Sequence, residues 1–459
     1  MEGYGIISVL PVFTILVIAI STKRTLFAMV CGLSVGALIL AGGITEFIGT
    51  WFNYLYASMT NETLQWLLLV IVMFGMLIML FERSHAVQDF GRWAGKYIHT
   101  KRQAMFGTII LGVIIFLDDY LNNLAVGTTM KGVTDRLGIP RTQLAYVVNS
   151  VAAPVCVLIP LSSWAVFFAA LLENEGIVGA DGTGMGAYIS SIPLIFYGWL
   201  AVLVVILQVI GVIPKLGPIK KDTLRVEETG DVFPEGTDLA LVQDVEGYEE
   251  EEGRKAAPWA FLIPLAIMIA ATLLTGIDVL MGAFFGVVSA FILYALQRRL
   301  SIKELLTSCY DGVISMGFVL ILCVLAFAVQ AANTDLLLAE YVISVAAPIM
   351  KGAFLPAAVF VVCAIYAYAT GCFWDLAAII MPIVVPLAIA MNVDPILASS
   401  AVFSGAAFGS NTCLYGDGVI LCSQGCQIRP GELMLATLPY ALIAGGGAFI
   451  LYILAGFIM

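Results

Sequence analysis

Long uncharged apolar stretches recur from one end of this chain to the other. Windows of about 17 to 25 residues without Asp, Glu, Lys or Arg are long enough, as helix, to cross about 30 Å of hydrocarbon. Hydrophobic residues make up 61% of the chain and charged residues only 12%, whereas a soluble domain carries about 25% charged residues. Because ten-residue segments of alternating hydrophobicity are not evident, helices are expected. The sequence therefore predicts an all-α polytopic membrane protein.

About ten transmembrane helices are expected from the apolar runs. They fall near 6–20, 25–41, 64–81, 143–172, 191–213, 258–275, 279–297, 313–331, 395–423 and 433–457. Two further stretches, 104–130 and 354–390, are interrupted midway by polar or charged residues, so each is either a full crossing or a re-entrant hairpin. The stretches 44–62, 83–102 and 333–350 look amphipathic and are expected at the membrane interface.

Loop charge favours two re-entrant hairpins. With ten crossings and two hairpins, 20 of the 21 Lys and Arg residues fall on one side, and only Lys351 falls on the other. This distribution follows the positive-inside rule. It predicts a multi-pass protein of the cell inner (cytoplasmic) membrane with both termini extracytoplasmic.

Two halves of the chain repeat the same pattern in opposite orientation. Residues 1–213 contain the hairpin 104–130 and a broken helix at 143–172, and residues 258–459 contain the hairpin 354–390 and a broken helix at 395–423. Between them, 214–257 is an acidic linker, expected to be a solvated cytoplasmic tether, and nothing suggests a nucleic-acid partner. Inverted repeats with discontinuous helices are typical of secondary transporters, whose site lies where the two breaks meet.

The first hairpin is interrupted by two adjacent carboxylates, Asp118 and Asp119, followed by Asn122 and Asn123. Carboxylates in hydrocarbon cost several kcal/mol unless they are protonated or bind something, so they suggest function. Such a pair can exchange a proton for a metal cation. The alternative is that they merely cap the returning half-helix.

Further candidate site residues lie in the other breaks. Pro154 and Pro160 interrupt the broken helix and free backbone carbonyls that can bind Na⁺. The polar residues around that gap are Asn149, Ser150, Ser162 and Ser163. The second half contributes Thr370, Trp374, Asp375, Ser410, Asn411, Thr412 and Asp417. We predict Asp118, Asp119 and Asn149 as the Na⁺ ligands and expect no organic cofactor.

Part of this pattern resembles the NhaC-type Na⁺/H⁺ antiporters of the ion transporter superfamily. The resemblance rests on Asp118-Asp119-Tyr120, Val126-Gly127, Ala145-Tyr146, Ser150, Ala152-Ala153-Pro154 and Ser162-Ser163-Trp164. It implies an elevator-type transporter in a homodimer, with Na⁺ and H⁺ as coupling ions. The chain departs from that family by having Asn149 in place of Asp, and Ser410 and Asn411 in place of Asp and His.

Two transport functions therefore stay open. The first is a cation-coupled antiporter in which Na⁺ and H⁺ compete for Asp118 and Asp119. The second is a Na⁺- or H⁺-coupled transporter of a small organic solute, such as an amino acid, an amine or a carboxylate. An enzyme is not expected, because the sequence lacks a metal triad, a nucleophile–base pair and a phosphate loop.

Overall fold

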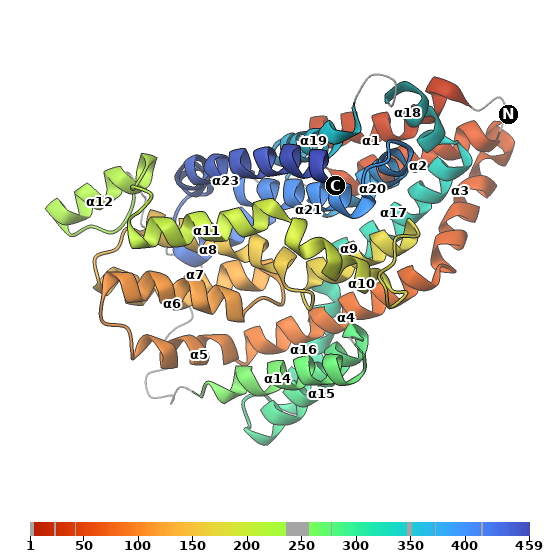
Figure 1. The fold of residues 1–459 in the computed structure, drawn as a ribbon. Coiled ribbons are helices and arrows are strands. Elements are labelled where there is room, and N and C mark those ends of the chain that lie inside the picture. Colours follow the sequence, from red (N-terminus) through yellow and green to blue (C-terminus); the bar gives the residue numbers. More distant parts are fainter. Residues whose placement is uncertain are drawn as a thin grey trace.

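The computed structural model describes residues 4–22, 24–41, 43–235, 257–276, 278–346, 351–371, 373–414 and 416–459. Within these ranges the regular structure is entirely helical (Figure 1). The first half contains η1 (Gly5–Val9), α1 (Leu10–Thr22), α2 (Thr25–Ala41), α3 (Ile44–Met59), α4 (Glu62–Arg83), α5 (Ala86–Gly95), α6 (Lys101–Ile114), α7 (Asp119–Arg136), α8 (Arg141–Leu158), α9 (Ser163–Asn174), α10 (Gly184–Ser191), η2 (Ile192–Leu194), α11 (Phe196–Ile210) and α12 (Gly217–Thr229). The second contains α14 (Trp259–Leu274), α15 (Val279–Leu296), α16 (Ile302–Ser315), α17 (Gly317–Asp335), α18 (Leu338–Ala346), η3 (Gly352–Phe354), α19 (Leu355–Thr370), α20 (Phe373–Ala390), α21 (Pro395–Thr412), α22 (Asp417–Cys426) and α23 (Pro430–Ile458).

Helices α8 and α21 lie at the centre and are buried on nearly every side. A helix buried all round needs side chains that are apolar or small, and α21 is rich in Ala, Ser and Gly. At Gly405 and Gly409, α21 lies directly against Cys363 and Ala367 of α19, where a β-carbon would collide. Small residues thus allow α21 and α19 to pack closely.

Helices α6 and α7 are antiparallel and joined by a short break at residues 115–118. At their open end, Lys101 Nζ donates to the Gly138 carbonyl oxygen at 3.1 Å. At the tip, the Asn122 amide donates to the carbonyl oxygens of Gly112 and Ile115 at 2.6 and 3.0 Å. One side chain therefore satisfies carbonyls that the end of α6 leaves without helical partners.

Helices α19 and α20 form a second antiparallel pair, because Gly352 lies against the Met391 carbonyl at their open end. Each pair is followed by two helices in succession: α8 and α9 meet at 40°, and α21 ends at Thr412 before α22 begins at Asp417. The same succession of elements therefore occurs twice. The division into inverted repeats and the placing of both pairs as re-entrant hairpins stay predictions.

The remaining helices pack outside this centre (Figure 1). Helix α17 packs on α2 and α3, and α4 packs on α15 and α16. Helices α4 and α16 touch through glycines: a β-carbon at Gly312 would lie 2.3 Å from the Gly75 oxygen. Helices α3, α5 and α18 occupy the stretches expected to be amphipathic.

Helix lengths support several membrane spans, consistent with a polytopic membrane protein. Among the described residues, five helices are long and apolar enough to cross a membrane, or up to seven if each bent pair is one span. Four shorter apolar helices also occur, and the total of ten spans stays a prediction. Two expected spans differ in detail: α17 begins at Gly317 after the separate helix α16, and the span near 191–213 is bent by 48° between η2 and α11.

The described part of the acidic linker is packed against the protein, unlike the solvated tether that its composition suggests. In α12, Asp222 accepts a hydrogen bond from Thr142 of α8 at 2.8 Å. Beyond α12, the Phe233 ring lies 4.3 Å from the guanidinium of Arg141, which also pairs with Asp135 at 2.7 Å. Composition did not predict this packing, because two or three specific contacts to the helices are enough to order an otherwise polar segment. Residues 236–256 lie outside the described ranges.

Gly312→Ala is expected to lower the free energy of unfolding by about 1–3 kcal/mol, because the added methyl collides with the α4 backbone at Gly75, which cannot move away as a side chain could. The measurement is the thermal unfolding midpoint of purified protein. Gly446→Ala on α23 is the control, since a β-carbon there meets nothing within 4 Å. Equal midpoints for the two variants would contradict the close crossing of α4 and α16.

A polar cluster joins the end of α9 to α17 and α4. Gln330 of α17 exchanges hydrogen bonds with Asn174 and Glu175, and Asn174 accepts from Asn61, the N-cap of α4, at 3.2 Å. Burial raises the pKa of Glu175, in the loop after α9, from 4.5 to about 7. The folded protein therefore holds this proton more tightly than the unfolded chain does.

Glu175 is expected to make stability depend on pH. The protonated Glu175 side chain contributes to the free energy of unfolding fully below about pH 4.5. This contribution declines as the pH rises and is lost above about pH 7. The change is about 3 kcal/mol. Thermal unfolding midpoints of wild type and Glu175→Gln across this range check it: the variant's midpoint should fall less between pH 4.5 and 7. Parallel curves would remove Glu175 as the cause.

Candidate functional site

Asp118 occupies the break between α6 and α7 and caps α7. Its Oδ1 accepts hydrogen bonds from the backbone N–H groups of Tyr120 and Leu121 at 2.9 and 3.3 Å. Its Oδ2 accepts from the Ser163 hydroxyl at 2.7 Å. These donors satisfy the start of α7 and stabilise a carboxylate there. Asp118 thus has the capping role that the sequence left as an alternative.

The start of α9 holds the break from the other side. The backbone N–H of Ser163 donates to the Leu117 carbonyl at 2.9 Å, and Ser162 caps α9 by accepting from the Ala165 N–H at 3.1 Å. The indole N–H of Trp164 donates to Asp119 Oδ1 at 2.8 Å. Asp119 is fully buried. Both carboxylates are therefore held by consecutive residues of one helix end.

The start of α22 brings the second half of the chain to Asp119. The position of a β-carbon at Gly418 lies 3.2 Å from Asn123 Nδ2, 3.5 Å from Asp119 Oδ2 and 3.5 Å from Ser410 Oγ. The absence of a side chain at Gly418 thus leaves room where a carboxylate, an amide and a hydroxyl converge. The carboxylate and hydroxyl oxygens suit a hard cation or a proton, whereas Asn123 presents its amide nitrogen at this point.

Aromatic rings connect this point to α20. The Trp164 ring stacks on Phe373, with centroids 5.1 Å apart and planes at 14°, and its centroid lies 5.4 Å from that of Trp374. A β-carbon at Gly416 would lie 4.0 Å from Phe373. The N-terminal ends of α7, α9, α20 and α22 therefore gather in one region. Their partial positive charges favour negative groups there, including the two aspartates.

Asn149 and Asn411 belong to a second group of polar contacts. The Asn149 amide donates to the Asn411 carbonyl oxygen at 2.8 Å and to Thr437 at 3.4 Å. The Asn411 amide donates to the Tyr197 hydroxyl at 3.2 Å. The side-chain oxygen of Asn411 is buried without a hydrogen-bond partner within the described chain. The structure therefore connects Asn149 with Asn411 and Thr437, although the sequence grouped it with Asp118 and Asp119.

The other predicted site residues divide into three groups. Asn122 closes the tip of the α6–α7 pair, and its Oδ1 is buried without a hydrogen-bond partner among the described residues. Ser150 is buried on α8, and Thr412 donates to the Phe408 carbonyl of its own helix at 2.7 Å. The side chains of Thr370, Asp375 and Asp417 lie outside what the structure describes.

A cavity of about 210 Å³ borders Asp118 on the side of α4 and α5. It is lined by residues of α7 together with Ile78, Met79, Glu82, Val87, Gln88, Ser315, Met316 and Leu421. The lining is mostly apolar, with Asp118, Glu82 and Gln88 as its polar groups besides Tyr120 and Ser315. Open space therefore reaches one of the two carboxylates.

Two residues of this arrangement were not among the predicted site residues: Trp164 and Gly418. Trp164 follows Ser163 in the run that carries the family resemblance, so its position in sequence was a usable signal. Gly418 follows Asp417, but only the packing of α22 on α7 shows that it lies beside Asp119 and Asn123.

Broken helices meeting at buried carboxylates in an apolar helical protein define a membrane transporter. The chain belongs to the Na⁺/H⁺ antiporter family, whose model matches residues 155–457. This confirms the family that the sequence resembles. A transporter family also agrees with the prediction that the protein is not an enzyme.

Other proteins share its sequence or fold. An uncharacterized protein of Haemophilus influenzae is 27% identical over 98% of this chain and 91% of its own length. The YdaH transporter of Alcanivorax borkumensis has a similar structure, with a TM-score of 0.59 at 16% identity over 89% of this chain and 88% of its own. MtrF of Neisseria gonorrhoeae, from a class of antimetabolite efflux pumps, gives 0.61 at 13% identity over 91% and 85%. At these identities the two structures establish a shared fold.

Asp118→Ala is expected to lower the free energy of unfolding by about 1–3 kcal/mol, because two backbone N–H groups and the Ser163 hydroxyl lose their acceptor. Asp118→Asn keeps one oxygen for the α7 backbone and should cost less. Thermal unfolding of both variants measures the difference. If Asn is as costly as Ala, the negative charge rather than the cap stabilises the break.

Proposed function

We propose that this protein is a cation-coupled secondary active transporter of the Na⁺/H⁺ antiporter type, in which Na⁺ and H⁺ compete for the Asp118–Asp119 site. The observation that carries the proposal is the convergence of Asp119, Asn123 and Ser410 around the space at Gly418. It joins a buried carboxylate of one half of the chain to a hydroxyl of the other.

The contacts suggest different roles for the two aspartates. Asp118 already accepts hydrogen bonds on both oxygens, including two from the α7 backbone. Its main contribution is then to hold the break in shape. Asp119 has the oxygen that faces Asn123, Ser410 and the space at Gly418. We propose Asp119 as the group that exchanges a proton for Na⁺, with the Ser410 hydroxyl supplying a neutral oxygen.

Coupling follows from the cost of an uncompensated charge in hydrocarbon. Asp119 can be neutral by taking a proton, or it can be compensated by a bound Na⁺, and a single buried site favours one or the other. If only these two states move across the membrane, inward movement of one ion is tied to outward movement of the other.

The movement itself is proposed to be of the elevator type in a homodimer. In this scheme the central helices carrying the breaks move against the outer helices. The cavity beside Asp118 supports this, because it lies where α7 and α22 face α4, α5 and the start of α17. We also propose that both termini lie outside the inner membrane, because this orientation puts the basic loops on the cytoplasmic side.

A second candidate is Na⁺- or H⁺-coupled transport of a small organic solute, and one observation favours it. Four helix N-termini meet beside the Trp164–Phe373 stack. Their dipoles could hold a carboxylate next to a bound Na⁺, and the rings could hold an apolar part of the solute.

Transport by purified protein in proteoliposomes tests the ion site. Asp119→Asn is expected to abolish Na⁺/H⁺ exchange, Asp118→Asn to leave some exchange, and Gly418→Ala to weaken apparent Na⁺ affinity by about tenfold, since its methyl fills the ion's space. Gly132→Ala on α7 is the control, because a β-carbon there meets nothing within 4 Å.

Two outcomes contradict this assignment. Full exchange by Asp119→Asn would remove that carboxylate from the coupling step. The second candidate would be established if an ion gradient drives uptake of an amino acid, amine or carboxylate and no Na⁺/H⁺ exchange occurs when that solute is left out.

A further inference from the structure

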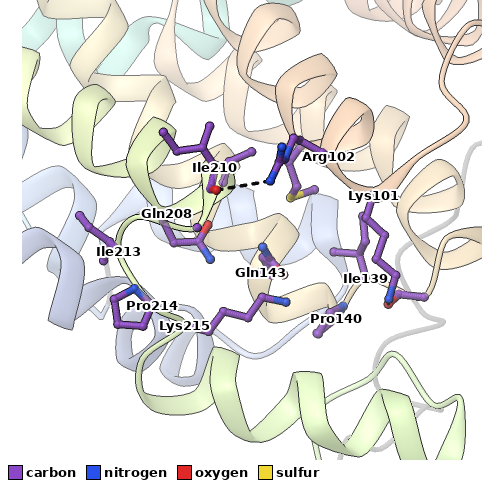
Figure 2. Close-up of a pocket in the computed structure, with 14 residues that line it drawn as sticks. Lys101, Arg102, Ile139, Pro140, Gln143, Gln208, Ile210, Ile213, Pro214 and Lys215 are labelled. Carbon is purple, nitrogen blue, oxygen red and sulfur yellow. Dashed lines mark hydrogen bonds between the residues drawn. The ribbon is translucent and has the colours of Figure 1, made fainter.

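A basic cavity lies far from the carboxylate site, at the open end of the α6–α7 pair. Its volume is about 430 Å³, and Figure 2 shows the residues that line it. They come from the start of α6, the loop between α7 and α8, the first turn of α8, the end of α11 and the loop that follows it. None of these residues belongs to the proposed ion site.

The cavity carries positive charge without a compensating acid in its wall. Lys101, Arg102 and Lys215 line it, and the fourteen lining residues, all within the described ranges, include no Asp or Glu. Among the described residues, Lys101 donates to the Gly138 carbonyl at 3.1 Å and Arg102 to the Ile210 carbonyl at 3.4 Å. Lys215 donates to the Thr223 hydroxyl at 3.1 Å. An ammonium has three donors and a guanidinium five, so each base has further N–H groups to offer.

Gln208 adds an independent sign of a ligand. Its side chain is only 3% exposed, and neither its amide nitrogen nor its amide oxygen has a hydrogen-bond partner in the described part of the chain. Figure 2 shows this amide turned toward the space between Arg102, Gln143 and Lys215. A buried amide without partners is costly, and a bound polar group would supply them.

The surroundings of Lys215 indicate that the bound polar group is an anion. Burial, together with the nearby charge of Lys101, lowers the pKa of Lys215 below its usual value, although the charge of Glu227 opposes this. A negative charge placed between these two bases would relieve both effects.

We propose that this cavity binds a phosphate-bearing anion, held by Lys101, Arg102, Lys215 and the Gln208 amide. Charge-assisted hydrogen bonds from several bases suit the oxygens of a phosphate ester. Phosphate can come from a lipid headgroup or from solution. The headgroup of an anionic lipid fits better, because Met105, Ile139 and Ile213 supply apolar wall beside the bases, and basic pockets between membrane helices suit such headgroups.

Binding of short-chain lipids to purified protein in a neutral detergent tests the proposal. Dioctanoyl phosphatidylglycerol should raise the thermal unfolding midpoint, dioctanoyl phosphatidylcholine should have little effect, and inorganic phosphate shows whether a free anion suffices. The variant Lys101→Gln/Arg102→Gln/Lys215→Gln should weaken the phosphatidylglycerol affinity by about tenfold or more, because it removes the charged donors. Lys96→Gln/Arg136→Gln/Lys220→Gln removes the same charge from exposed positions outside the cavity and should keep the affinity.

Gln208→Leu separates binding from a structural role. It removes the buried amide, so the midpoint without ligand should stay level or rise, while the shift caused by phosphatidylglycerol falls. The proposal is overturned if the cavity variant and the exposed control lose affinity equally, or if neither phosphatidylglycerol nor inorganic phosphate shifts the wild-type midpoint. A response to phosphate as large as the response to phosphatidylglycerol would assign the site to a free anion.

Discussion

The structure depends on satisfying polar backbone where helices stop inside an apolar protein. Water is scarce there, so the N–H and C=O groups released at a helix end need partners from the chain itself. At the first break these partners are Asp118 for the start of α7, Asn122 for the end of α6, and Ser162 for the start of α9. The residues that make the break possible therefore also place two carboxylates at the centre of the protein.

The same requirement accounts for the way the two halves of the chain meet. Once α7 and α9 begin at adjacent points, the indole of Trp164 reaches Asp119 and its ring reaches Phe373 of α20. The backbone of α22 approaches Asp119 and Asn123 because residue 418 is glycine. At this break, polar contacts hold the first half together, and ring stacking and a missing side chain bring the second half against it. Away from the break, hydrogen bonds such as that from Asn149 to Asn411 also connect the halves. The ion that we propose would bind here without breaking the hydrogen bonds that support the helix ends.

Much of the fold could be predicted from the sequence, because each membrane helix corresponds to a long uncharged apolar run of consecutive residues. The breaks at Asp118 and near Ser410 were also predictable, since charged and polar residues interrupt those runs. Less predictable were the roles of individual residues. Asn149 was grouped with the aspartates but contacts Asn411 and Thr437, and the linker's Asp222 and Phe233 pack against the start of α8. Those contacts join residues 80 to nearly 290 positions apart.

By itself, the sequence determined that this is an apolar helical membrane protein, which segments are interrupted, and which carboxylates lie within the interruptions. It did so because the transfer of side chains into hydrocarbon is nearly additive along the chain. Only the tertiary structure decided that Asp118 caps a helix while Asp119 faces Gly418 and Ser410, and that three bases and Gln208 enclose a separate cavity. Those outcomes depend on which helix ends meet in space, and that is set by packing between segments distant in sequence.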